Sequence, residues 1–150
     1  MSARPLLQVE GLRTWFPIRK GVFQRTVGWV KAVDGVDLAL TRGMTLGLVG
    51  ESGCGKTTLG RSLLRLEEPR EGSSIVYEGR ELTDMGFTEM REMRRKMQII
   101  FQDPYSSLNP RLSIAEAITE PMKVHNLYDT ADERREKAGD LMERVGLTRV

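Results

Sequence analysis

The first forty residues carry apolar side chains at short, strand-like spacing. The pattern predicts strands over Leu6–Leu12 and Val30–Leu40, with a bend at Gly35 inside the second. The segment between them, PIRKGVFQRTVG, contains three cations: Arg19, Lys20 and Arg25. A solvated hairpin or loop is the favoured interpretation of this segment over a binding patch, because charge runs usually mark solvent-facing surface.

A nearly continuous apolar run, MTLGLV, follows at Met44–Val49 between two glycines. Such a run is typical of a strand buried on both faces of a parallel sheet. An amphipathic helix is predicted directly after it, over Lys56–Leu66, because leucines recur at i, i+4 and i+7. The order is therefore strand, glycine-rich loop, helix.

The middle of the chain alternates strand and helix signals again. Short strands are predicted at Ser74–Tyr77 and Met97–Phe101. Between them lies a helix whose buried face is expected to carry Phe87, Met90, Met93 and Met97. Its other face is basic and is interpreted as solvated, since no aromatic stacking pattern accompanies the cations.

Two capping boxes open the last third of the chain, S-x-x-E at Ser113 and T-x-x-E at Thr130. They predict one helix that runs to Pro121 and a second that runs to Gly146.

Composition narrows the class of protein. The chain has 150 residues, 39% of them hydrophobic and 29% charged, as in ordinary globular domains. A net charge of +2 is too small for a nucleic-acid footprint, so no nucleic-acid partner is expected. Neither a membrane-spanning run nor a secretory leader is found, and the single Cys54 agrees with a reducing cytosol.

The glycine-rich loop carries the clearest chemistry. Its pattern is G-x-x-x-x-G-K-[ST], formed by Gly50, Glu51, Ser52, Gly53, Cys54, Gly55, Lys56 and Thr57. Glycines let backbone N–H groups turn inward around a β-phosphate. Lys56 would contact the β- and γ-phosphates, the Thr57 hydroxyl would bind Mg²⁺, and Thr58 would donate to the α-phosphate. A turn without a ligand does not explain a lysine placed at a helix N-terminus, where a cation is disfavoured.

Neither the cysteine nor the lone histidine suggests a second site. Cys54 occupies a variable position of the loop and is interpreted as a spacer, since a catalytic thiol needs a histidine partner. His125 falls in a polar turn and is interpreted as a solvated side chain.

Two segments carry a family resemblance. LGLVGESGCGKTTLGRSLLRLEEP and MQIIFQDPYSSLNPRLSI resemble the ATP-binding cassette (ABC) ATPases of oligopeptide and dipeptide importers. The resemblance implies an α/β fold: a P-loop NTPase (RecA-like) core, an N-terminal antiparallel β subdomain and the start of an α-helical subdomain. It divides the chain into residues 1–112, the β subdomain and core, and residues 113–150, the start of the helical subdomain.

The same resemblance implies roles for residues outside the loop. Gln102 corresponds to the Q-loop glutamine, a ligand of Mg²⁺ or of the attacking water, and is catalytic together with Lys56. The segment 103–109 would contact a membrane subunit. Phe16 is selected as the ring that stacks on adenine, and Trp15 is the competing candidate. Either ring could instead be a structural anchor in the core or the hairpin.

As a whole, the resemblance implies an ATP-binding subunit of an importer for oligopeptides, dipeptides or similar solutes. Its cofactors would be ATP and Mg²⁺, and its partners transmembrane permease subunits and a second ATP-binding subunit. It would lie in the cytoplasm, peripheral on the inner face of the plasma membrane.

The chain stops before the family's signature motif, catalytic glutamate and switch histidine, so it resembles the front half of an ATPase. Alone, it is expected to bind ATP without turnover, to be marginally stable and to self-associate through an uncovered edge at Met44–Val49. A nucleotide-binding module without turnover remains the alternative function. A P-loop kinase would need an acceptor site and a lid that the sequence does not show.

Overall fold

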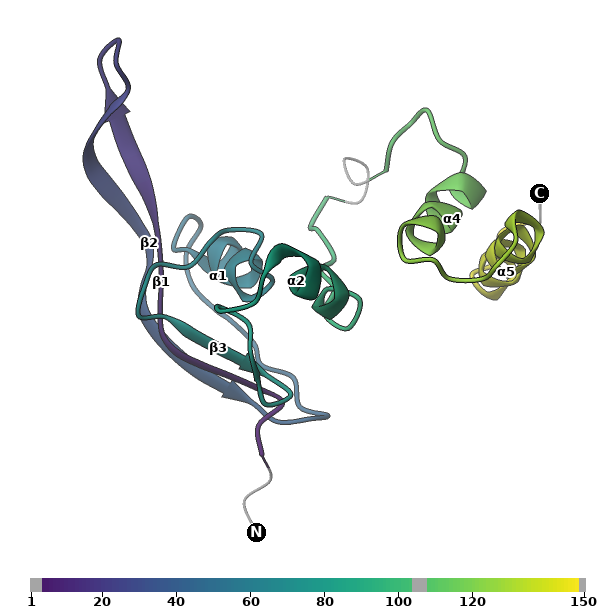
Figure 1. The fold of residues 1–150 in the computed structure, drawn as a ribbon, viewed down its shortest axis with the longest axis horizontal. Coiled ribbons are helices and arrows are strands. Elements are labelled where there is room, and N and C mark those ends of the chain that lie inside the picture. Colours follow the sequence, from purple (N-terminus) through teal and green to yellow (C-terminus); the bar gives the residue numbers. More distant parts are fainter. Residues whose placement is uncertain (1–3, 104–107, 149–150) are drawn as a thin grey trace. The chain divides into compact units, whose positions relative to one another are not determined.

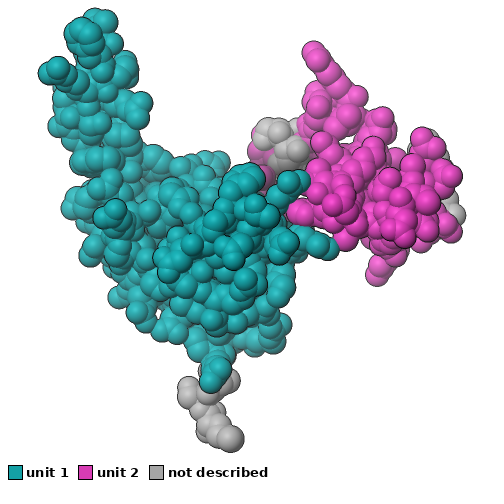
Figure 2. Space-filling view, in the orientation of Figure 1, with its two compact units in different colours: residues 1–99 teal, residues 100–150 magenta. Residues whose placement is uncertain are grey.

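The chain forms two compact units, residues 1–99 and residues 100–150 (Figure 2). The structure is a computed structural model that describes residues 4–103 and 108–148. The division expected from the family resemblance, between residues 112 and 113, stays a prediction.

Unit 1 is built on a four-stranded antiparallel sheet in the order β2-β1-β3-β4 (Figure 1). The strands are β1 (Leu7–Lys20), β2 (Arg25–Leu40), β3 (Ser74–Tyr77) and β4 (Arg80–Glu81). This confirms the predicted antiparallel β subdomain and the predicted strand at 74–77. The segment 17–28 is the end of a long β1–β2 hairpin, because the ladder continues to the turn.

The β1–β2 ladder is irregular at two glycines. Gly11 and Gly35 have φ of 57° and 77°, and the register shifts beside each of them. Positive φ is costly for residues with a Cβ, so glycine suits these bulges. The bend predicted at Gly35 is confirmed.

Two helices complete unit 1, α1 (Lys56–Leu63) and α2 (Phe87–Met93). Both contribute to one core together with the sheet, and its buried members are Leu7, Val9, Leu12, Val33, Leu59, Ile75, Leu82, Met90 and Met93. The prediction for Phe87 is wrong, because its side chain is 80% exposed. The helix begins at that residue, and Met85 before it packs against the core instead.

Two predicted strands are not formed. Met44–Val49 and Met97–Phe101 have neither helical nor strand structure, and the Val49 side chain is fully exposed. A central parallel strand depends on hydrogen-bonded neighbours on both sides. Within residues 4–103 and 108–148 the sheet consists of the four strands β1, β2, β3 and β4 alone. Neither apolar run is hydrogen-bonded to any of them. These two predictions are wrong for this structure.

Unit 2 contains the helices α4 (Ile114–Val124) and α5 (Ala131–Arg144). Both predicted capping boxes are present. The Ser113 hydroxyl accepts the N–H of Glu116 at 3.2 Å, and the Thr130 hydroxyl accepts that of Glu133 at the same distance. Each glutamate in turn accepts the N–H of its cap residue, which satisfies donors that a helix start leaves free.

The helix ends differ in how well the sequence predicts them. α4 continues through Pro121 to Val124, beyond the predicted end, and buries Met122 against the rest of the unit. α5 ends at Arg144, and Gly146 follows with φ of 78°, as a helix-terminating glycine does. Among the residues that the structure describes, no helix has the length and apolar character needed to cross a bilayer.

A carboxylate organises the turn between β3 and α2. Glu81 accepts hydrogen bonds from the Ser74 and Thr83 hydroxyls and from the N–H groups of Ile75 and Thr83. Partial burial acts to raise the pKa of Glu81, but these hydrogen bonds outweigh it and lower the pKa to about 2.

Glu81→Gln tests this role. A carboxylate whose pKa is lowered on folding stabilises the protein above its unfolded pKa, and the contribution is lost as pH falls from about 4.5 toward 2. We expect the variant to lose about 1–2 kcal/mol of unfolding free energy at pH 7 and less at lower pH. Urea titrations at several pH values measure this difference. An equal loss at pH 7 and at pH 3 would contradict the assignment.

Candidate functional site

The glycine-rich loop lies directly against strand β2. Gly55 is the N-cap of α1 and has φ of 96°, a left-handed conformation that disfavours any side chain. A Cβ at this position would overlap the carbonyl oxygen of Ala32. Glycine is therefore required at this point by both the backbone angle and the close approach of the loop to the strand.

The loop curls around the ammonium group of Lys56. The Nζ atom donates to the carbonyl oxygens of Gly50 and Glu51 at 2.8 and 2.6 Å and lies 3.4 Å from the Cys54 sulfur. A Cβ on Gly50 would lie only 2.7 Å from that sulfur. The Lys56 ammonium thus lies within the curve of the loop, bonded to its carbonyl oxygens.

Helix α1 is fixed to the sheet by a buried pair of hydroxyls. Thr14 of β1 and Ser62 of α1 lie 2.7 Å apart, and the Ser62 hydroxyl donates to the carbonyl of Thr58 at 2.8 Å. Since Ser62 has one hydroxyl proton, Thr14 is the donor of the pair. The other end of α1 is capped by Arg94, which donates to the Leu64 and Arg65 carbonyls at 2.9 and 2.6 Å. One member of the predicted solvated basic face thus has a structural role.

The rest of the loop faces solvent. Glu51, Ser52, Gly53, Cys54 and Thr57 are exposed, and Thr58 is half-buried. The first N–H groups of a helix have no partner within the helix and carry its positive end. Solvent therefore reaches most of the loop that precedes α1, while Lys56 itself is half-buried.

The two candidate rings for adenine lie on opposite faces of β1. Side chains alternate along a strand, so Phe16 shares the face of Thr14, on which α1 packs, and Trp15 points the other way. Trp15 is already engaged: its indole donates to Asp34 at 3.0 Å, and Lys31 lies 4.5 Å from its ring centre. Phe16 is 36% exposed on the face of the loop and helix.

The remaining predicted residues belong to unit 2. Gln102 belongs to unit 2, and its side chain is exposed. Of the expected coupling segment 103–109, residues 104–107 lie outside the described residues. His125 caps the C-terminal end of α4, where its N–H donates to the Pro121 carbonyl at 3.0 Å. Across the described part of the chain, no group of three or more His, Cys, Asp or Glu could hold a metal ion.

The sequence carries no local signal for three residues that position the loop or its helix. Thr14, Ala32 and Arg94 hold the loop or its helix, yet none belongs to a local motif. Thr14 and Ser62 are 48 positions apart, and no spacing rule joins such a pair. The hydroxyls of Thr14 and Ser62 can be recognised as partners only when strand β1 and helix α1 are packed together.

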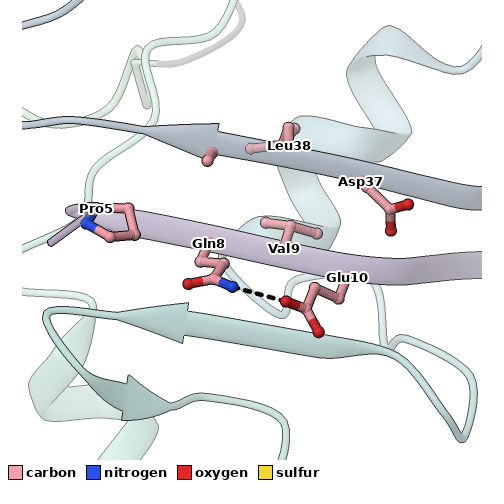
Figure 3. A pocket seen from close by; sticks show the side chains of 7 residues that line it. Pro5, Gln8, Val9, Glu10, Asp37 and Leu38 are labelled. Carbon is pink, nitrogen blue, oxygen red and sulfur yellow. Dashed lines mark hydrogen bonds between the residues drawn. The ribbon is translucent and has the colours of Figure 1, made fainter. Parts of the chain in front are cut away.

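A depression lies on unit 1, along the first half of β1 and the last part of β2 (Figure 3). Its polar lining includes Gln8, which donates to Glu10 at 2.6 Å, and Asp37, which accepts the N–H of Gly11. Two carboxylates and no cation in the lining disfavour a phosphate ligand. The loop at the start of α1 remains the candidate site.

Comparison with known proteins assigns the family. The sequence profile of the ABC transporter family matches residues 33–150. The chain belongs to the ABC transporter family. It is 48% identical over 143 residues to the oligopeptide transport ATP-binding protein AppF of Bacillus subtilis, covering 95% of this chain and 43% of the relative. It is 47% identical over 143 residues to the dipeptide transport ATP-binding protein DppF of Haemophilus influenzae, with the same two shares covered.

Solved ABC cassettes have the same fold. The dimeric post-hydrolysis structure of the ATP-binding cassette MJ0796, bound to ADP and Pi, superimposes with a TM-score of 0.70 at 21% identity. The match covers 91% of this chain and 56% of that chain. The α/β fold class inferred from the ABC resemblance is confirmed, and the chain spans less than half the length of the two curated relatives named above.

Gly55→Ala tests the packing of the loop on β2. We expect it to lower the unfolding free energy by about 1–3 kcal/mol, because the added Cβ combines overlap with a left-handed φ. Gly60→Ala is the matched control, since it lies inside α1 with open space around its Cβ, and should raise stability by about 0.5–1 kcal/mol. Denaturant titrations give both values. A Gly55→Ala protein as stable as the parent would refute the close approach.

Proposed function

We propose that this chain is the ATP-binding part of an importer for oligopeptides, dipeptides or similar solutes. The observation that carries the proposal is the loop at Gly50–Thr58, which curls around the Lys56 ammonium at the start of a helix. Two sources of positive potential lie together there: the Lys56 ammonium and the N-terminus of α1. A polyphosphate is the ligand that this arrangement suits.

Binding of ATP would change the partners of Lys56. Its ammonium now donates to two neutral carbonyls, at Gly50 and Glu51. Charge-assisted hydrogen bonds to phosphate oxygens are stronger than bonds to neutral acceptors, so the β- and γ-phosphates would compete for this group. Gly53, with φ of 81°, would orient backbone N–H groups toward the phosphates.

Magnesium would accompany the nucleotide. Mg²⁺ is commonly held by one or two protein oxygens together with phosphates and waters, so a dedicated cluster of carboxylates is not needed. The Thr57 hydroxyl, exposed at the second residue of α1, would supply one oxygen. The amide oxygen of Gln102 would supply another and would orient the attacking water, as the family resemblance implies.

Transport would require other chains. The relatives AppF and DppF are named as ATP-binding proteins of oligopeptide and dipeptide transport. By the same proposal, this chain pairs with a second ATP-binding subunit, and both contact transmembrane permease subunits at the inner face of the plasma membrane. Residues 1–112 would be the β subdomain and P-loop core, and residues 113–150 would begin the helical subdomain. Lys56 and Gln102 would serve hydrolysis in that assembly.

Lys56→Ala should abolish Mg·ATP binding, with at least about a hundredfold loss of affinity, because it removes the one ammonium inside the loop. Calorimetric titration of a non-hydrolysable ATP analogue with Mg²⁺ measures this loss. Lys123→Ala, which removes an exposed ammonium from α4, is the control and should bind as the parent does. Equal affinity of the Lys56→Ala protein and the parent would defeat the assignment.

Phe16→Ala and Trp15→Ala separate the two candidate adenine rings. Loss of a stacked ring costs about 1–3 kcal/mol, so Phe16→Ala should weaken ATP binding by roughly tenfold or more. Inorganic triphosphate, which has no base, should bind both variants equally. Trp15→Ala should leave the nucleotide affinity within about threefold of the parent, since that ring lies on the opposite face. The reverse pattern would assign Trp15 instead.

A further inference from the structure

The end of the β1–β2 hairpin stands out from the rest of unit 1 (Figures 1 and 2). β1 pairs with β3 only over Leu7–Glu10, so the far half of the hairpin is a two-stranded ribbon. Every residue from Phe16 to Val27 is exposed. Isolated two-stranded ribbons are marginal in water, and a surface of this extent needs an explanation.

The turn at the tip is apolar. Val22 and Phe23 occupy the centre of the turn, with side chains 95% and 85% exposed. The turn is closed by the N–H of Gln24, which donates to the Gly21 carbonyl at 3.1 Å. Turn centres normally carry Gly, Pro, Asn, Asp or Ser. Further apolar side chains are exposed along the ribbon: Ile18, Val27, Trp29 and Val30.

The charge at the outer end of the ribbon has one sign. Asp34, at its base, is the register partner of Arg13 and forms an ion pair with Lys31. Residues 11–33 contain no Asp or Glu, and they contain five cations: Arg13, Arg19, Lys20, Arg25 and Lys31. The chain as a whole is nearly balanced, with 23 basic and 21 acidic residues, so the segregation is local. An anionic partner is the complement of such a surface.

One pair of these cations is unfavourable within the fold itself. Lys20 and Arg25 are direct register partners across the two strands. Like charges in this arrangement repel each other. Among the ion pairs of residues 4–103 and 108–148, none involves Arg19, Lys20 or Arg25. An external anion would relieve a repulsion that the structure leaves uncompensated.

We propose that this tip inserts into an anionic phospholipid surface. Val22 and Phe23 would enter the boundary between headgroups and acyl chains, and Arg19, Lys20 and Arg25 would meet lipid phosphates behind them. Lys20 and Arg25 each lie two residues behind the apolar pair, at the end of β1 and the start of β2. Apolar side chains of interfacial segments are buried about 5–10 Å deep, so the order of the residues matches the order of layers in a bilayer.

The same order disfavours a nucleic acid as the partner. A polyanion presents its charges outermost, so cations would be expected at the extreme tip, which is held here by two apolar side chains. The structure confirms the solvated hairpin that the sequence favours for PIRKGVFQRTVG, and the proposal adds a lipid contact at its tip. Nucleotide binding plays no part in this argument, because the tip and the loop at Gly50–Thr58 are separate sets of residues.

Vesicle co-sedimentation tests the proposal on the 150-residue chain. We expect binding to vesicles of phosphatidylcholine with 30% phosphatidylglycerol, weak binding to phosphatidylcholine alone, and a loss of binding in 0.5 M salt. Val22→Ser with Phe23→Ser should lower the partition coefficient by about tenfold or more. Lys20→Gln with Arg25→Gln should lower it by about tenfold on anionic vesicles only.

Matched controls distinguish vesicle binding by the tip from nonspecific binding by other exposed apolar or basic side chains. Phe87→Ser removes an equally exposed phenyl ring from α2, and Lys123→Gln with Arg135→Gln removes two cations from unit 2. Both should bind vesicles as the parent does. Circular dichroism and binding of the ATP analogue, measured on every variant, show that folding and the nucleotide site are intact. Absence of vesicle binding by the parent, equal binding to neutral vesicles, or an equal loss in the controls would each overturn the proposal, whatever the result for ATP.

Discussion

The close approach of Gly55 to the carbonyl of Ala32 is the contact on which the site depends. It places the last residue of the loop against β2, and the Thr14–Ser62 hydrogen bond then fixes the helix that follows to β1. With both strands of the hairpin engaged, the start of α1 has a defined position relative to the sheet. A phosphate cradle needs this precision, because its N–H donors are part of the backbone and cannot adjust as side chains do.

A set of hydrogen bonds from Arg65, Arg94 and Glu81, here called the polar frame, links α1 to the rest of unit 1. Arg94 of α2 caps the C-terminal end of α1, and Arg65, just after α1, donates to the carbonyls of Leu82 and Met85. Glu81 gathers the turn that leads to α2. The two arginines donate to backbone carbonyls, and Glu81 accepts from backbone N–H groups, at the ends of helices and strands. The frame explains why basic residues with the periodicity of a solvent face are partly used inside the fold.

The β1–β2 hairpin unites two proposed contacts. Strand β1 carries Phe16 on the face against which α1 packs, and the hairpin ends in the apolar, basic tip. A single pair of strands would thus link a nucleotide site with a lipid surface in a chain of the ABC transporter family. Because side chains alternate along β1, Phe16 and Trp15 lie on opposite faces of the sheet. A shift of the strand register by one residue would exchange the two faces.

Local patterns in the sequence determined much of this structure. The capping boxes at Ser113 and Thr130, the glycine bend at Gly35, the strand at 74–77 and the loop motif at Gly50–Thr57 were all predictable, because each depends on residues close together in the chain. The apolar run Met44–Val49 predicted a strand that the structure does not form, since a strand exists only with a partner and periodicity does not supply one. Only the tertiary structure decided that Thr14 meets Ser62, that Gly55 meets Ala32 and that Arg94 caps α1, because these contacts join residues 23 to 48 positions apart and arise from packing, which no local spacing encodes.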